Sequence, residues 1–170
     1  TAVAAAGGDI ATLDEGANTD WQDEIFRSAI TNNHDLSFGA GNSNSNYRVS
    51  LSYQNQQGIV EKSGLRRYTG RIRANHKVLN DRVTLTANFT VGSVFDQNSL
   101  ITNTPGFEGD LLGAALSSNP TRPIFDENGD FVQPGNDQRN PAAILAFVED
   151  NTTTTRVLGA ASANVNIIDG

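Results

Sequence analysis

The amino-acid sequence predicts an all-β fold, in which antiparallel strands form part of a transmembrane β-barrel and short helices lie in long loops. Residues 47–54 and 83–91 alternate between apolar and polar side chains, as strands with one apolar and one polar face do. The connections between the predicted strands alternate between short and long, which is typical of bacterial membrane barrels. Alternation alone also fits a soluble sheet that covers a core. The alternating connection lengths favour a membrane barrel over a soluble sheet.

Residues 1–32 are expected to form a loop with one short helix. The segment TDWQDEIF begins at Thr19, and either Thr19 or Asp20 can cap a helix whose first turn holds Asp23 and Glu24. We interpret these acidic residues as helix-capping groups and not as a catalytic pair or a cation site, because no histidine or further carboxylates accompany them.

Residues 33–94 are expected to form four antiparallel strands. The alternating segments are 34–42, 47–54, 67–76 and 83–91. Turn-forming residues at 43–46 and 79–81 predict tight connections, and the polar segment 57–66 predicts a longer loop between the second and third strands.

Residues 95–155 form a connection long enough to carry structure of its own. Helical patterns occupy 109–120 and 140–150, and the second begins with Pro141 at a favoured first-turn position after the Asn140 cap. Between them, IFDENGDFV predicts a small hairpin over Asn128 and Gly129.

The same hairpin contains a pattern that resembles the start of a calcium-binding loop. Asp126, Asn128 and Asp130 have the spacing of the first three ligands of such a loop. However, Phe131 stands where the loop requires glycine, and Asp137 stands where it requires glutamate. The sequence therefore predicts a plain turn and no metal site.

Residues 156–170 are expected to form the fifth strand and the start of a turn. RVLGAASANVNII alternates as a strand, and Asp169 with Gly170 is typical of a hairpin turn. Because no strand follows that turn, we expect the 170 residues to be part of a longer protein.

Composition excludes several classes of function. The net charge of -7 and pI of about 4.6 argue against general nucleic-acid binding, even though seven basic residues fall between Lys62 and Arg82. The chain has no cysteine, which excludes disulfides and thiol chemistry. His34 and His76 stand alone in strand patterns, and no nucleophile, phosphate or dinucleotide motif is present. We expect no enzymatic activity, no catalytic residue and no cofactor.

Four segments, in their order and spacing, carry a resemblance to a known family. They are TDWQDEIF at 19–26, GIVEKSGLRRYTGRI at 58–72, FEGDLLGAALSSNPTRPIF at 107–125 and RVLGAASANVNIIDG at 156–170. Over residues 17–170 the chain resembles the early barrel of a SusC/RagA-type TonB-dependent outer-membrane transporter.

The resemblance implies a large barrel of 22 strands that encloses an N-terminal plug. It also implies a bacterial outer-membrane location, a SusD-like surface lipoprotein as partner, and import of glycans or peptides with energy delivered by TonB through parts of the protein outside this sequence. On this resemblance, residues 1–32 end one extracellular loop and residues 95–155 form another. The five strands would be the second to sixth of the barrel, and five strands are too few to close one.

The barrel interpretation assigns the two faces of the strands. The residues predicted to face the lumen, where they can contact the plug or the solute, are Arg48, Arg71, Arg73, Asn75, Thr84, Thr86 and Asn88. Those predicted to face outer-membrane lipid are Tyr47, Val49, Leu51, Tyr53, Ile72, Leu85 and Phe89. Tyr47 and Tyr53 lie roughly 20 Å apart along their strand and are expected near the two membrane interfaces.

Two alternatives remain at the level of sequence. A soluble or surface β-rich ligand-binding module would bury the apolar face under a second layer and stay soluble without detergent. A hydrolase would require carboxylates from Asp20, Asp23 or Asp126 to converge in a cleft.

Overall fold

The computed structural model describes residues 13–101, 110–133, 135 and 139–167. The chain divides into two compact units. The sheet unit comprises Ile30–Gln57, Gly64–Asp96 and Asn151–Gly170, and the loop unit comprises Thr1–Ala29, Gly58–Ser63 and Gln97–Asp150. Each unit is therefore built from chain segments that lie far apart in the sequence.

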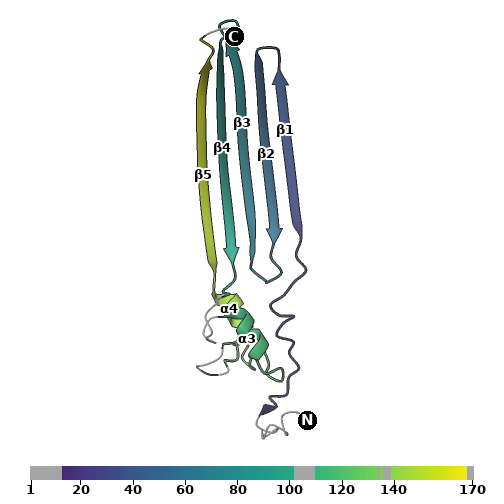
Figure 1. The fold of residues 1–170 in the computed structure, drawn as a ribbon. Coiled ribbons are helices and arrows are strands. Elements are labelled where there is room, and N and C mark those ends of the chain that lie inside the picture. The colour runs from purple at the N-terminus through teal and green to yellow at the C-terminus, as the bar shows by residue number, and fades with distance from the viewer. Residues whose placement is uncertain (1–12, 102–109, 134, 136–138, 168–170) are drawn as a thin grey trace. The chain divides into compact units, whose positions relative to one another are not determined.

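The strands form one five-stranded sheet whose spatial order is their order in the sequence, and neighbouring strands run in opposite directions (Figure 1). The strands are β1 Thr31–Gly41, β2 Ser45–Gln57, β3 Gly64–Val78, β4 Val83–Asn98 and β5 Asp150–Val165. This meander confirms the predicted antiparallel strands, and its long strands exceed the usual length in soluble domains.

Two tight turns join β1 to β2 and β3 to β4. In the first, the Asn42 side chain accepts hydrogen bonds from the backbone N–H groups of Asn44 and Ser45 at 2.9 and 2.8 Å. In the second, Leu79, Asn80 and Asp81 have positive φ angles of 56°, 54° and 68°. Asparagine and aspartate tolerate this left-handed conformation better than most residues, which explains why these residues predicted a turn.

The predicted limits of the long connection were wrong at both ends. β4 continues to Asn98 and β5 begins at Asp150, so the connection is shorter than the predicted 95–155. The threonine run at 152–155 has no apolar period that would mark a strand. Here β5 is extended by its pairing with β4. Strand pairing satisfies the backbone N–H and C=O groups of these threonines and does not depend on their side chains.

The loop unit has a small apolar core around two short helices, α3 Leu111–Ser117 and α4 Pro141–Phe147. The buried residues of this core are Trp21, Ile25, Val60, Leu111, Ala114, Ala115 and Ile144. Both helices lie inside the segments predicted to be helical. Their side-chain caps are Asp110 for α3 and Asn140 for α4, and the second cap and its following proline confirm the prediction.

The predicted helix after Thr19 is wrong. Asp20 caps the segment as expected, since its carboxylate accepts from the N–H groups of Gln22 and Asp23 at 3.0 and 3.2 Å. However, the chain makes only a turn and then leaves at Phe26, which forms an antiparallel bridge with Val60. That bridge, together with burial of the neighbouring Ile25 in the core, holds the chain in an extended path that a continued helix would not allow.

Asn140 is the one buried polar residue among the described residues, and its side chain makes hydrogen bonds through both its oxygen and its nitrogen. Its oxygen accepts from the N–H groups of Ala142 and Ala143, and its amide donates to the carbonyls of Ile124 and Val132 at 2.9 and 3.0 Å. It thus caps α4 and ties it to the hairpin.

Replacing Asn140 with alanine in the full-length protein is expected to destabilise the loop unit by about 2 kcal/mol, because the helix loses its cap and the part-buried carbonyls of Ile124 and Val132 lose a donor. Hydrogen exchange of the amides in α4 measures the effect. Asn140→Ser keeps a capping oxygen but not the two amide donors, so its exchange rates should fall between those of Asn140→Ala and the wild type. Equal protection in all three would contradict the anchoring role.

Candidate functional site

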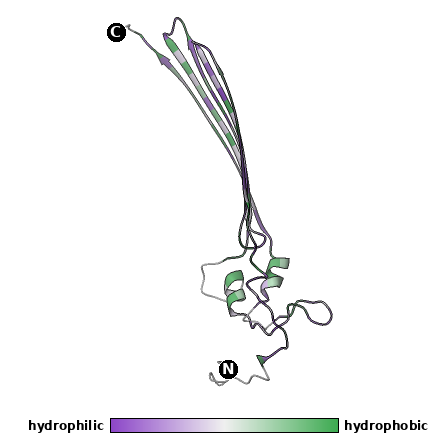
Figure 2. Ribbon diagram, turned by 90° about the vertical axis from the view of Figure 1, so that its right-hand side faces the viewer, coloured by the Kyte–Doolittle hydropathy of each residue, from purple (hydrophilic) through white to green (hydrophobic). Residues whose placement is uncertain are grey.

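The sheet presents one apolar face, and the strand register determines which side chains share it. Leu36 lies opposite Leu51, and Val49 lies opposite Ile72. β4 is the neighbour of β3 on its other side. A Cβ atom added at Gly70 would contact the side chain of Val91, so Val91 of β4 lies on the same face of the sheet as Gly70. We call this side, with its alternate residues on every strand, the apolar face; Figure 2 shows hydrophobic and hydrophilic residues alternating along the strands. All the residues predicted to face lipid belong to it.

The apolar face is uncovered within the sheet unit. Phe38 keeps 62% of its surface exposed, and Leu51 keeps 54%. No residue of the five described strands is fully buried. A contiguous apolar surface of this kind marks a site where a protein meets lipid or another protein.

The opposite side, which we call the polar face, carries most of the charge of the sheet. Arg48 lies directly opposite Arg73, and Ser50 lies opposite Arg71. Hydrogen bonds join Ser52 to Asp35 at 2.5 Å and Thr86 to Asn75 at 2.9 Å. The residues predicted to face the lumen share this face by strand alternation.

Among the described residues, Arg48, Arg71 and Arg73 make no ion pair. Like charges directly opposite one another on neighbouring strands repel. The polar face is therefore suited to contact anionic or hydrogen-bonding groups that approach it from outside the described chain.

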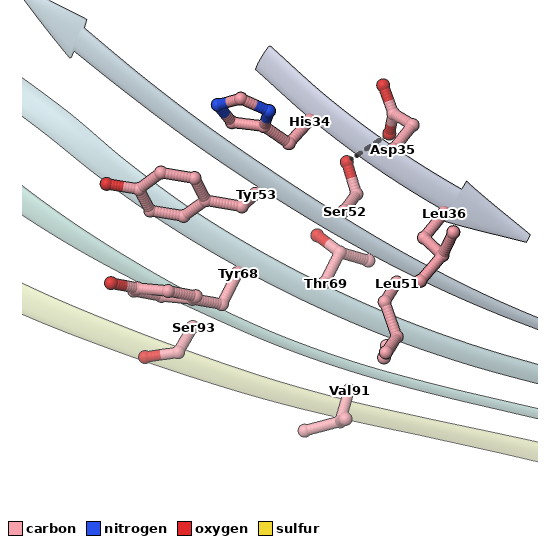
Figure 3. Close-up of a pocket in the computed structure, with 11 residues that line it drawn as sticks. His34, Asp35, Leu36, Leu51, Ser52, Tyr53, Tyr68, Thr69, Val91 and Ser93 are labelled. Atoms are coloured by element: carbon pink, nitrogen blue, oxygen red, sulfur yellow. Dashed lines mark hydrogen bonds between the residues drawn. The ribbon is translucent and has the colours of Figure 1, made fainter. Parts of the chain in front are cut away.

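A row of three aromatic rings crosses β1, β2 and β3 on the apolar face. The rings of His34 and Tyr53 have centroids 6.1 Å apart and are stacked, and those of Tyr53 and Tyr68 are 5.0 Å apart and tilted by 37°. Figure 3 shows the three side chains pointing the same way from adjacent strands. The alternation of β2 predicted Tyr53 on the apolar face, whereas only the strand register aligns His34 and Tyr68 with it.

A shallow hollow of about 680 Å³ adjoins the aromatic row (Figure 3). Leu36, Leu51 and Val91 line its apolar floor, together with Gly70, which leaves space because it has no side chain. At the other end of the sheet, His76 contacts Ser45 through Nδ1 at 2.5 Å. The two histidines of the chain thus lie in separate settings.

The hairpin over Asn128 and Gly129 is confirmed, with a bridge between Phe125 and Phe131 and a φ of 85° at Gly129. The Asp126 carboxylate accepts from the N–H groups of Asn128 and Asp130 at 2.8 and 2.9 Å. These bonds, chiefly that from Asp130, hold the pKa of Asp126 below its ordinary value. The carboxylate is therefore engaged in the turn.

The described residues contain no group of three or more histidine, cysteine or acidic side chains arranged to hold a metal ion. Asp137, the last position of the apparent calcium loop, lies outside the described residues. Asp20 and Asp126 belong to two turns and are each bonded to their own backbone. In the described part of the chain, no helix is long and apolar enough to cross a membrane.

Comparison with known proteins identifies relatives that match most of the chain. TonB-dependent receptor SusC of Bacteroides thetaiotaomicron is 34% identical over 131 residues, which are 77% of this chain and 12% of that protein. TonB-dependent receptor P3 of Formosa agariphila is 32% identical over 164 residues, or 91% of this chain and 16% of that protein. No family model matches the chain.

A solved structure described as the RagAB peptide transporter has the same fold. It aligns with a TM-score of 0.71 and 20% identity over 90% of this chain and 18% of the larger one. A second, described as the RagAB peptide importer in a closed-closed state, aligns with a TM-score of 0.68 and 19% identity. The chain thus spans less than a fifth of the length of the relatives it matches.

These likenesses, together with the two-faced meander, define the class: the five strands are part of the barrel of a TonB-dependent receptor, a class of outer-membrane proteins. The chain belongs to the SusC family of TonB-dependent receptors.

Proposed function

We propose that the full-length protein imports a glycan or peptide nutrient across the bacterial outer membrane by a TonB-dependent route, and that this chain forms part of the barrel wall without enzymatic chemistry. The observation that carries the proposal is the single sheet with one apolar and one arginine-bearing face. A wall between lipid and a polar lumen needs both faces, whereas a soluble sandwich would cover the apolar one with a second layer.

In this proposal the apolar face contacts lipid and the polar face lines the lumen. Four successive apolar positions on β2, from Tyr47 to Tyr53, extend roughly 20 Å at the usual strand rise. Because the strands of such barrels are tilted by about 40°, this length spans about 15 Å along the membrane normal, within the apolar band of about 25 Å on outer-membrane barrels. The Arg48 and Arg73 pair would then face the plug or the passing solute.

The loop unit would lie outside the cell, where its core around Trp21 and α3 holds together the described parts of the long connection. There it would help to enclose the solute beneath a SusD-like surface lipoprotein. The resemblance of the sequence supports this partner and the contact with TonB elsewhere in the protein. The two RagAB structures are described as a peptide importer and a peptide transporter, which makes a peptide one of the two solute classes to test.

The test uses the full-length protein in a bacterium that lacks its own copy of the gene. We expect the protein in the outer-membrane fraction, and we expect uptake of either a fluorescent oligosaccharide or a fluorescent peptide that stops when the proton-motive force is dissipated. Recovery in the soluble fraction without detergent would instead support a soluble β-rich binding module. Uptake that persists without the proton-motive force would contradict the TonB-dependent route.

A further inference from the structure

A row of hydrogen-bond donors crosses the apolar face immediately beyond the aromatic row. Asn32 lies opposite Asn55, and Asn55 lies opposite Arg66. Each stands two positions along its strand from an aromatic residue of the row, so all three share its face. The apolar face thus ends, on these three strands, in aromatic rings followed by amide and guanidinium groups.

Arg66 is exceptional in its charge. It is the only aspartate, glutamate, lysine or arginine that strand alternation places on the apolar face of the five described strands. Its neighbour Arg67, like Arg71 and Arg73, lies on the polar face. A charge is costly on a lipid-facing surface at the membrane midplane but not near the interface, so the position of Arg66 beyond the aromatic row fits the level of lipid headgroups.

The guanidinium of Arg66 is held but not neutralised. Its central carbon lies 4.9 Å from the centre of the Phe95 ring, a cation–π contact that fixes the group while leaving its N–H donors at the edge. Among the described residues it forms no ion pair or hydrogen bond, and the residue is exposed. A planar guanidinium in this setting matches a phosphate, which it can bind through two parallel hydrogen bonds.

The hollow beside the aromatic row provides an apolar continuation of the same surface. Its glycine, Gly70, lies four residues from Arg66 on β3, or about 13 Å along the strand. A molecule that placed a phosphate at Arg66 could therefore lay a hydrocarbon chain over Gly70, where an added Cβ would contact Leu51 and Val91; Figure 3 shows these two side chains. A free phosphate ion would use only the polar end of this surface.

We propose that Arg66, Asn55 and Asn32 bind the phosphate of an anionic membrane lipid whose acyl chain occupies the hollow at Gly70. The proposal rests on the proposed function, because it requires the apolar face to meet lipid. The lipid would fix the depth of the barrel wall in the membrane at its aromatic row. One guanidinium and two side-chain amides would recognise the lipid headgroup, and the aliphatic side chains that line the hollow would contact the acyl chain.

The experiment uses the full-length protein in a neutral detergent, to which phosphatidylglycerol or zwitterionic phosphatidylcholine is added, and counts bound lipids by native mass spectrometry. We expect the wild type to prefer phosphatidylglycerol and Arg66→Gln to bind it about tenfold more weakly, the change expected when one charge-assisted contact is lost. Arg66→Lys should retain part of the preference, since it keeps the charge but not the planar fork.

Arg67→Gln is the matched control, because it removes the same charge one residue away on the polar face. It should bind phosphatidylglycerol as the wild type does, and inorganic phosphate should not displace the lipid. Unchanged binding in Arg66→Gln would overturn the proposal, and displacement by inorganic phosphate would assign the site to a free anion. An equal loss in Arg67→Gln would show that the faces are wrongly assigned, whereas failure of the wild type to reach the outer membrane would count against the proposed function itself.

Discussion

Replacing Leu51 with arginine is expected to destabilise the assembled barrel by about 2 to 4 kcal/mol, the penalty for a cation at the midplane of a lipid-facing strand. Leu51 lies between the aromatic residues Tyr47 and Tyr53 on the apolar face, and it is 54% exposed in the sheet unit. A covering of lipid would leave the new guanidinium without water or a partner. Denaturant unfolding of the full-length protein in lipid vesicles measures the loss, and the assembled fraction in cells should fall with it.

Ser52→Arg is the control for this prediction. Ser52 is the next residue on β2 but lies on the polar face, opposite Asp35, so an arginine there gains an acidic neighbour and should change stability by less than about 1 kcal/mol. Ser50 suits the purpose less well because it lies opposite Arg71. If both substitutions were tolerated equally, the apolar face would not be in contact with lipid.

Trp21→Ala is expected to destabilise the loop unit by about 3 to 5 kcal/mol, because the change removes a large buried side chain and leaves a cavity in a small core. Trp21 is only 4% exposed, and its indole Nε1 donates to the carbonyl of Asn119 at 2.8 Å, linking positions 98 residues apart. The expected result in the full-length protein is rapid proteolysis and rapid hydrogen exchange within the loop unit, while the barrel strands stay protected.

Trp21→Phe separates packing from hydrogen bonding at this position. Phenylalanine keeps much of the apolar volume, so the loop unit should be destabilised less than in Trp21→Ala. The Asn119 carbonyl still loses its donor, which leaves an expected destabilisation of about 1 to 3 kcal/mol. Loss of protection in the barrel strands as well would mean that the two units unfold together. Unchanged protease resistance in Trp21→Ala would contradict the role of this core.

The strand faces were predictable from the sequence because side chains in a strand alternate with a period of two. Once Val49 and Leu51 are on one side, Arg48 and Ser50 must be on the other, whatever the strand pairs with. The cap at Asn140 was predictable for a similar reason, since the favoured residue types at a helix start are local.

The aromatic row and the donor row beyond it were not predictable in this way. His34, Tyr53 and Tyr68 belong to three strands, and a shift of two residues in either pairing would keep every face unchanged while separating the rings. The turn lengths restrict the register but the alternation does not. Arg66 also lay in the predicted loop 57–66, so its place on the apolar face beyond the row came from the structure, in which β3 begins at Gly64.

The sequence by itself determined which side of the sheet each strand residue occupies, where the two helices of the long connection lie and where the tight turns fall, because each depends on neighbours a few residues away. The tertiary structure decided the ends of β4 and β5, the single turn at Trp21 in place of a helix, and the rows that cross the strands. These depend on backbone pairing and on packing between segments distant in the chain, where a long-range contact such as that of Phe26 with Val60 overrides local preference.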